Sequence, residues 1–152
     1  LRTKLYKKLY LIIFFYLISV IHGNSKEIQI VSDLLEIDRE KRTSVFSGSV
    51  YVLEEEMEIW AEKITVIFND NDNQIKEFFL EDNVKIVRLN MTATGESGFY
   101  SPISDTIEMF NEVKIVENGN FVKCDELFLD IKNSVSIMKS DNRNRVEALI
   151  VN

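Results

Sequence analysis

The stretch NGNFVKCDELFLDI, residues 118–131, contains a break in its apolar alternation. Apolar side chains stand on even positions up to Cys124 and on odd positions from Leu127 onward, and the change of phase falls at Asp125. Successive side chains of a β-strand point to opposite faces of the sheet. A strand that crosses this point must therefore bulge or turn a corner if it is to keep one apolar face.

The same break recurs in three other segments. Aligned on an acidic residue, the four segments read IQIVSDLLEI, MEIWAEKITV, MTATGESGFY and NFVKCDELFL, with anchors at Asp33, Glu62, Glu96 and Asp125. The anchors lie 29, 34 and 29 residues apart, and the residue before each anchor is small. Apolar residues fill fourteen of the sixteen places at offsets −5, −3, +2 and +4. This spacing predicts strands that bend at equivalent points of a stacked repeat.

A second signature lies between the anchors. The segments FSGSVYV, LEDNVKI and MFNEVKI centre on Val50, Val84 and Val113, and each valine precedes the next anchor by 12 residues. The residue two places before each valine is a turn former: Gly48, Asp82 and Asn111. We expect turns there. No stretch of ten residues after Ser25 has helical spacing, so the sequence predicts an all-β fold.

Two polar stretches are predicted to be connectors. NDNDNQ, residues 69–74, joins two strand-like runs and should form a hairpin or a longer turn. It lacks the glycine and the bidentate glutamate of a calcium-binding loop. EEEME, residues 54–58, is predicted to be a charged loop that discourages unwanted edge pairing.

Composition and charge limit the class of protein. The 152 residues carry a formal net charge of −7, from 18 Lys and Arg against 25 Asp and Glu. An acidic chain without clustered cations is a poor partner for a phosphate backbone, so we set nucleic-acid binding aside. The length predicts one domain with a core large enough to fold without crosslinks.

The N-terminus has the pattern of a secretory signal peptide. Four cations in the first eight residues precede an apolar run of 13 residues, LYLIIFFYLISVI. This run is shorter than the roughly 20 residues of a transmembrane helix. Gly23 and Ser25 provide small side chains for cleavage after Ser25. We expect residues 1–25 to direct export and residues 26–152 to form the mature domain, with an uncleaved anchor as the alternative.

Patterns for catalysis and metal binding are missing from the sequence. There is no Ser/His/Asp set, no Gly-rich phosphate loop and no His or Cys cluster. The one histidine, His22, lies in the predicted signal peptide, and the one cysteine is Cys124. We interpret Cys124 as a buried, small apolar side chain. The sequence therefore predicts neither an enzyme nor a bound cofactor or metal.

The segment IQIVSDLLEIDREKRTSVFSGSVYVLEEEMEIWAEKITV resembles the opening of the OstA-like domain of the LptA family of periplasmic lipopolysaccharide-transport proteins. The elements I-x-I-x-S-D, F-x-G-x-V-x-V and A-[DE]-[KR]-hydrophobic follow in the order and spacing of that family. GESGFYSPISDTIEMFNEVKIVENGNFVKCDELFLD and NRVEALIVN match its second half and its final strand. The resemblance covers residues 27–152. It implies a twisted, partly open β-jellyroll of many short antiparallel strands, whose trough holds acyl chains.

The resemblance also implies a role and a set of lipid-contacting residues. The protein would shield the acyl chains of lipopolysaccharide, or of a related lipid, between the inner and outer membranes. By position in the family, the residues nearest the lipid are Ile28, Ile30, Ile86 and Tyr100. The apolar alternation adds Ile37, Val52, Val66 and Leu129 as trough candidates. For each of them, packing in a dry core is the alternative interpretation, and the sequence indicates no contacts for a lipid head group.

Unpaired edges at both ends of the fold would allow head-to-tail homo-oligomers by β-augmentation. The predicted edges are Ile28 to Val31 and Val146 to Val151, and the predicted edge residues are Ile28, Ile30, Val146, Leu149 and Val151. The family implies an LptC-like inner-membrane protein and an LptD-like outer-membrane protein as partners. Two alternatives stay open: an LptC-type component that keeps its N-terminal anchor, and a ligand-free structural β-repeat domain that is exported.

Overall fold

The computed structural model describes residues 27–141 and 144–151. These residues form ten strands and no helix, so the all-β prediction is confirmed. The strands are β1 Ile28–Val31, β2 Leu34–Asp38, β3 Thr43–Glu54, β4 Met57–Phe68, β5 Ile75–Arg88, β6 Met91–Ser101, β7 Thr106–Glu117, β8 Asn120–Asp130, β9 Val135–Lys139 and β10 Glu147–Leu149. The predicted signal peptide, residues 1–25, lies outside the described residues.

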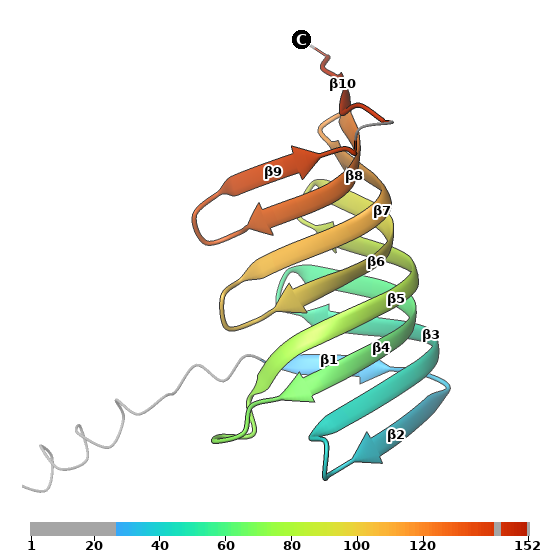
Figure 1. Ribbon diagram of the computed structural model, residues 1–152, viewed down its shortest axis with the longest axis vertical. Coiled ribbons are helices and arrows are strands. Elements are labelled where there is room, and N and C mark those ends of the chain that lie inside the picture. Colours follow the sequence, from blue (N-terminus) through green and yellow to red (C-terminus); the bar gives the residue numbers. More distant parts are fainter. Residues whose placement is uncertain (1–26, 142–143, 152) are drawn as a thin grey trace, which may run out of the picture.

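All ten strands belong to one antiparallel sheet (Figure 1). Its order is β1-β3-β4-β5-β6-β7-β8-β10, with β2 added beside β3 and β9 beside β8. From β3 to β8 each strand pairs with the next one in the chain. The predicted turn at residues 69–74 joins β4 to β5, which confirms that prediction. The long strands curve together, so the sheet forms an open trough with hairpins along its open side (Figure 1).

The predicted corners coincide with shifts in strand register. The pairs β3–β4, β5–β6 and β7–β8 each shift at one point. The residue that the even-numbered strand leaves unpaired there is the acidic anchor in every case: Glu62, Glu96 and Asp125. The slip of one residue keeps the apolar side chains of both strand halves on the inner face, as the phase change predicted.

Opposite each anchor, the odd-numbered strand contributes two consecutive residues with positive φ. These pairs are Gly48 and Ser49, Asp82 and Asn83, and Asn111 and Glu112. Gly, Asn and Asp tolerate this left-handed conformation better than other residues. The prediction of turns at these positions is therefore wrong, because the same residue types bend a continuous strand. At Gly48 a Cβ atom would lie 2.4 Å from Asp33 Oδ2, so only glycine fits without displacing that carboxylate.

At the two ends of the sheet the corner separates two short strands. β1 and β2 pair with the two halves of β3, and Asp33 stands between them. β10 and β9 pair likewise with the two halves of β8. The Asp125 carboxylate accepts hydrogen bonds from the Asp141 N–H (2.9 Å) and the Asn144 side-chain amide (3.1 Å), and these bonds lower the pKa of Asp125. At each end of the sheet, therefore, a break between two short strands takes the place of the bend in a continuous strand.

The EEEME segment is not the predicted charged loop. Glu54 is the last residue of β3 and Met57 the first of β4, so only Glu55 and Glu56 form the turn. Glu54 is 3% exposed and faces inward. The physical reason is the strand alternation, which continues past the apolar inner positions of β3 and brings the next inner position onto a glutamate.

Inner-face side chains form one hydrophobic core. The apolar residues larger than alanine that are at most 1% exposed are Val50, Val52, Ile59, Ile64, Val66, Phe78, Leu80, Val84, Ile86, Tyr100, Ile107, Met109 and Val113. Burial of one such apolar side chain contributes about 1.5–3 kcal/mol. The core therefore lies in the middle of the trough, between the short strands at the two ends.

Candidate functional site

The inner face of the trough holds all eight predicted lipid-contacting residues, at three levels of exposure. Four of them are at most 1% exposed in the core: Val52, Val66, Ile86 and Tyr100. Three are partly buried and pack against the core: Ile28, Ile30 and Leu129. Ile37 pairs with the inward-facing Ser44 and is 62% exposed. The inner face is thus sealed at its centre and open at the β2 end.

The bends divide the long strands, and therefore the sheet, into two halves. Beside the sealed centre, one polar residue comes from each half. Glu54 at the end of β3 and Tyr100 near the end of β6 line one small cavity of about 50 Å³, together with Arg88 and Asp105. Burial, and then the charge of Glu54 and hydrogen bonding to its carboxylate, raise the pKa of Tyr100. We call Glu54 and Tyr100 the latch, because parting the halves here separates these two buried groups.

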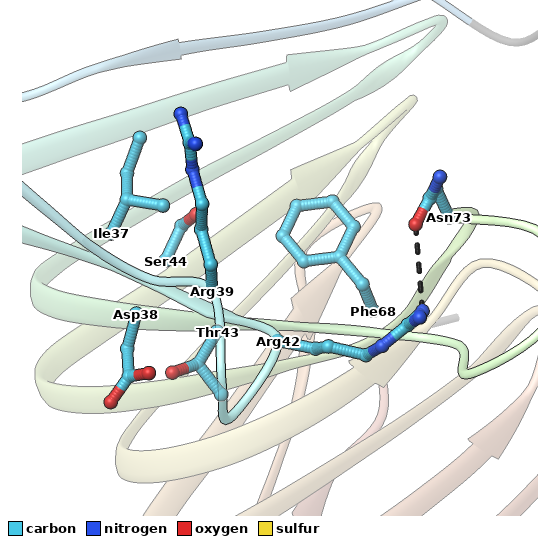
Figure 2. Close-up of a pocket in the computed structure, with 8 residues that line it drawn as sticks. All are labelled: Ile37, Asp38, Arg39, Arg42, Thr43, Ser44, Phe68 and Asn73. Carbon is cyan, nitrogen blue, oxygen red and sulfur yellow. Dashed lines mark hydrogen bonds between the residues drawn. The ribbon is translucent and has the colours of Figure 1, made fainter.

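The open end contains a pocket of about 360 Å³ between the β2–β3 and β4–β5 turns. Figure 2 shows Ile37, Ser44 and Phe68 on the inner side of the ribbon, whereas Asp38 and Thr43 point away. Arg39 and Arg42, from the β2–β3 turn, also line this pocket. Asn73 is the eighth lining residue. We call this space the end pocket.

The predicted partner edges lie at the two ends of the sheet. β1 has the predicted bounds, and β3 is its only partner among the described strands. The C-terminal edge is shorter than predicted, because only Glu147–Leu149 pairs with β8. The predicted edge side chains there are exposed, at 44%, 50% and 62% for Val146, Leu149 and Val151.

Cys124 is buried in the inner face, as predicted. Burial and the nearby Asp125 charge raise the pKa of its thiol, so it stays protonated at neutral pH and serves packing. Within residues 27–141 and 144–151, no group of three or more His, Cys, Asp or Glu side chains is placed to hold a metal. In the same part of the chain, no helix is long and apolar enough to cross a membrane.

Sequence reasoning missed the latch and the cations of the end pocket. For Glu54 the signal was present, because its position continues the inner alternation of Val50 and Val52. For Arg39 and Arg42 the signal was weak. They lie in the polar segment DREKR, which the sequence alone does not connect to Phe68 or Asn73.

A protein-family model described as "LptA/(LptD N-terminal domain) LPS transport protein" matches residues 29–135, well over half of the chain. The chain belongs to this LptA/LptD N-terminal family. The family resemblance drawn from the sequence motifs is therefore confirmed. The register shifts described above all fall within the matched range.

The fold of this LptA/LptD N-terminal family member is also found in a solved structure. It is the crystal structure of LptH, the LptA homologous periplasmic component of the lipopolysaccharide transport device of Pseudomonas aeruginosa. The TM-score is 0.75 at 14% sequence identity, over 84% of this chain and 96% of that chain. The predicted jellyroll fold is thus confirmed. A search of curated proteins finds no match.

Proposed function

We propose that this member of the lipopolysaccharide-transport family works in the periplasm, exported by its N-terminal segment, and shields lipid acyl chains on the inner face of its trough. The observation that supports this role is an apolar inner face that runs along the sheet and opens at the β2 end, where Ile37 is 62% exposed. The cargo would be lipopolysaccharide or a related acylated lipid.

The energetics favour a covered path for such a lipid. Exposure of one methylene group to water costs about 0.8 kcal/mol, so a twelve-carbon chain costs on the order of 10 kcal/mol. The inward-facing side chains at the centre of the trough are buried against one another. Acyl chains would therefore enter where the face is open and advance only as the two halves of the sheet part at the latch.

Assembly is proposed to use the two sheet edges. The β1 edge and the β10 edge offer unpaired backbone groups that a second copy can extend as a continuing sheet. Such a head-to-tail contact is heterologous and propagates. An LptC-like protein at the inner membrane and an LptD-like protein at the outer membrane would then cap the two ends of the assembly.

Photo-crosslinking from both faces of the same strand tests the proposed function. A crosslinkable residue is placed at position 30 or 37, whose side chains face inward. The matched controls are positions 29 and 36, which face outward on β1 and β2. In cells we expect lipid adducts from 30 and 37 and few from 29 and 36. Equal labelling of both faces, or no lipid on either, would contradict the proposal.

A ligand-free structural domain is the second candidate function. The observation that favours it is the burial of Val52, Val66, Ile86 and Tyr100 at 1% exposure or less, as in a dry core. Lipid extraction of the purified protein followed by mass spectrometry separates the two functions, because a structural domain would carry no amphiphile. N-terminal sequencing separates an exported protein that begins near Lys26 from one that keeps its N-terminal segment as an anchor.

A further inference from the structure

The end pocket combines an apolar wall with cations, which is unusual for this acidic chain. Phe68, which packs against the core, and the exposed Ile37 supply apolar surface. Arg39 and Arg42 are the basic residues of its lining, and Asp38 is the one acidic residue. The latch cavity is the opposite case, since it is lined by Glu54, Glu55, Glu56 and Asp105 against the single cation Arg88.

The one carboxylate of the end pocket is engaged elsewhere. Asp38 accepts hydrogen bonds from the backbone N–H groups of Lys41 (2.9 Å) and Glu40 (3.0 Å), and the Lys41 ammonium lies 3.2 Å from its other oxygen. The bonds from Lys41 lower the pKa of Asp38, so it stays ionised and bound to its own turn. In Figure 2 its carboxylate points away from the inner side of the ribbon. The arginines therefore determine the charge of the pocket.

Arg42 is held in position by the β4–β5 turn. Its Nη1 donates to the Asn69 carbonyl oxygen at 2.7 Å and lies 3.5 Å from Asn73 Oδ1. Its Nε is 4.0 Å from the exposed Asp70 carboxylate. These contacts fix one guanidinium beside the pocket, while Arg39 extends along its other side near Ile37 (Figure 2). Two guanidinium groups thus flank an apolar opening.

We propose that the end pocket binds the phosphate-bearing head group of an acyl lipid, with the start of its chain against Ile37 and Phe68. The proposal rests on the lipid-shielding function proposed above. A guanidinium group presents paired N–H donors that match phosphate oxygens, and Arg is better suited than Lys to such contacts. A lipid is favoured over a free phosphate ion because the cations stand next to exposed apolar surface that continues into the trough. The pocket would then receive the lipid at the β2 end of each domain.

Equilibrium binding of two lipids with identical chains to the full exported protein tests the inference. The probes are dilauroyl phosphatidic acid and dilauroylglycerol, which differ only in the phosphate. We expect the wild type to bind the phosphatidic acid roughly tenfold more tightly, as for charge-assisted hydrogen bonds. The double variant Arg39→Gln/Arg42→Gln should reduce this preference to within about twofold and leave dilauroylglycerol binding unchanged.

The control variant Lys132→Gln/Lys139→Gln removes the same charge from exposed sites near the other end of the sheet and should keep the preference. Arg39→Gln alone leaves the Arg42 contacts intact and should give an intermediate loss, which guards against a folding defect. Equal binding of both lipids by the wild type, or an equal loss in the control, would overturn the inference and leave the proposed function standing. Binding of inorganic phosphate as tight as that of phosphatidic acid would also overturn it. If neither lipid binds, the proposed function fails as well.

Discussion

The centre and the ends of the trough are built from the same strand pattern but differ in exposure. In the centre, inward-facing residues such as Val66 and Ile86 have neighbours on both sides and on the opposite half of the sheet, and they are at most 1% exposed. At the β2 end, Ile37 occupies the same kind of inner position and is 62% exposed, because the sheet stops there. The pattern therefore specifies which face of the strand is apolar, whereas position in the stack decides whether that face is core or surface.

Matched truncations of two isoleucines test this difference and should change stability more than any other variant proposed below. Ile86→Ala should lower the free energy of unfolding by about 2–5 kcal/mol, because it opens a cavity in the sealed centre. Ile37→Ala should change it by less than about 0.5 kcal/mol. Urea unfolding of both variants measures the pair. Similar losses would mean that the end is as well packed as the centre.

The latch should produce the next largest effect. Tyr100→Phe removes the one hydroxyl group from the cavity that Tyr100 shares with the buried Glu54 carboxylate, at a cost of about 1–3 kcal/mol. Because the pKa of Tyr100 is raised, the folded protein keeps a proton that the unfolded chain loses above about pH 10. The free energy of unfolding should therefore fall as pH rises above 10.

Tyr51→Phe is the matched control for the latch. The Tyr51 hydroxyl donates a hydrogen bond to Glu58 Oε2 at 2.8 Å, and this bond raises the pKa of Tyr51. Tyr51, however, lies on the outer face of the sheet. We expect Tyr100→Phe to remove most of the alkaline loss and Tyr51→Phe to remove little. Guanidinium unfolding curves at pH 8 and pH 11 would measure this loss. An equal effect of the two variants would show that the latch is not the main source of the alkaline loss of stability.

Two glycines with left-handed backbone conformations, Gly48 at a corner of the sheet and Gly119 in an open turn, allow these two settings to be compared. Gly48→Ala should cost about 1–3 kcal/mol, because φ is 84° and the new Cβ would lie 2.4 Å from Asp33 Oδ2. Gly119→Ala, with φ at 82° and no atom within 4 Å, should cost about 1 kcal/mol. Thermal unfolding of both variants measures the difference. A larger loss at Gly119 would contradict the corner contact.

The smallest effect is expected at the C-terminal end. The pKa of Asp125 is lowered by its bonds to Asp141 and Asn144, so the stabilisation is present above the unfolded value of about 3.9 and is lost as pH falls through the lower folded value. Protection of the Asp141 amide against hydrogen exchange should drop over that range. In Asp125→Asn it should be lower at neutral pH and insensitive to acid. If the protection of the Asp141 amide in Asp125→Asn equals that of the wild type at neutral pH, the Asp125 carboxylate does not stabilise this end of the sheet.

The bends were predictable from the sequence, whereas the residues that seal or open the trough were not. A slip of one residue in a period-2 pattern is local, so Glu62, Glu96 and Asp125 could be identified without coordinates. The left-handed pairs were misread as turns, because Asp82 and Asn83 favour the same conformation in either setting. Whether Ile37 or Val66 is buried depends on strands distant in sequence. The pocket beside Arg39 and Arg42 forms only because the β4–β5 turn, some thirty residues further along the chain, lies next to them. No local pattern in the sequence contains that information.

The left-handed pairs have a consequence for the length of the molecule. In a closed barrel the number of strands, their tilt and their stagger are linked, so a hairpin cannot be added without changing the diameter. Here each hairpin from β3 to β8 carries its own bend, and the sheet does not close on itself. A chain with more hairpins of this kind would build a longer channel of the same width, so such proteins can match different spans by duplication of one two-strand unit.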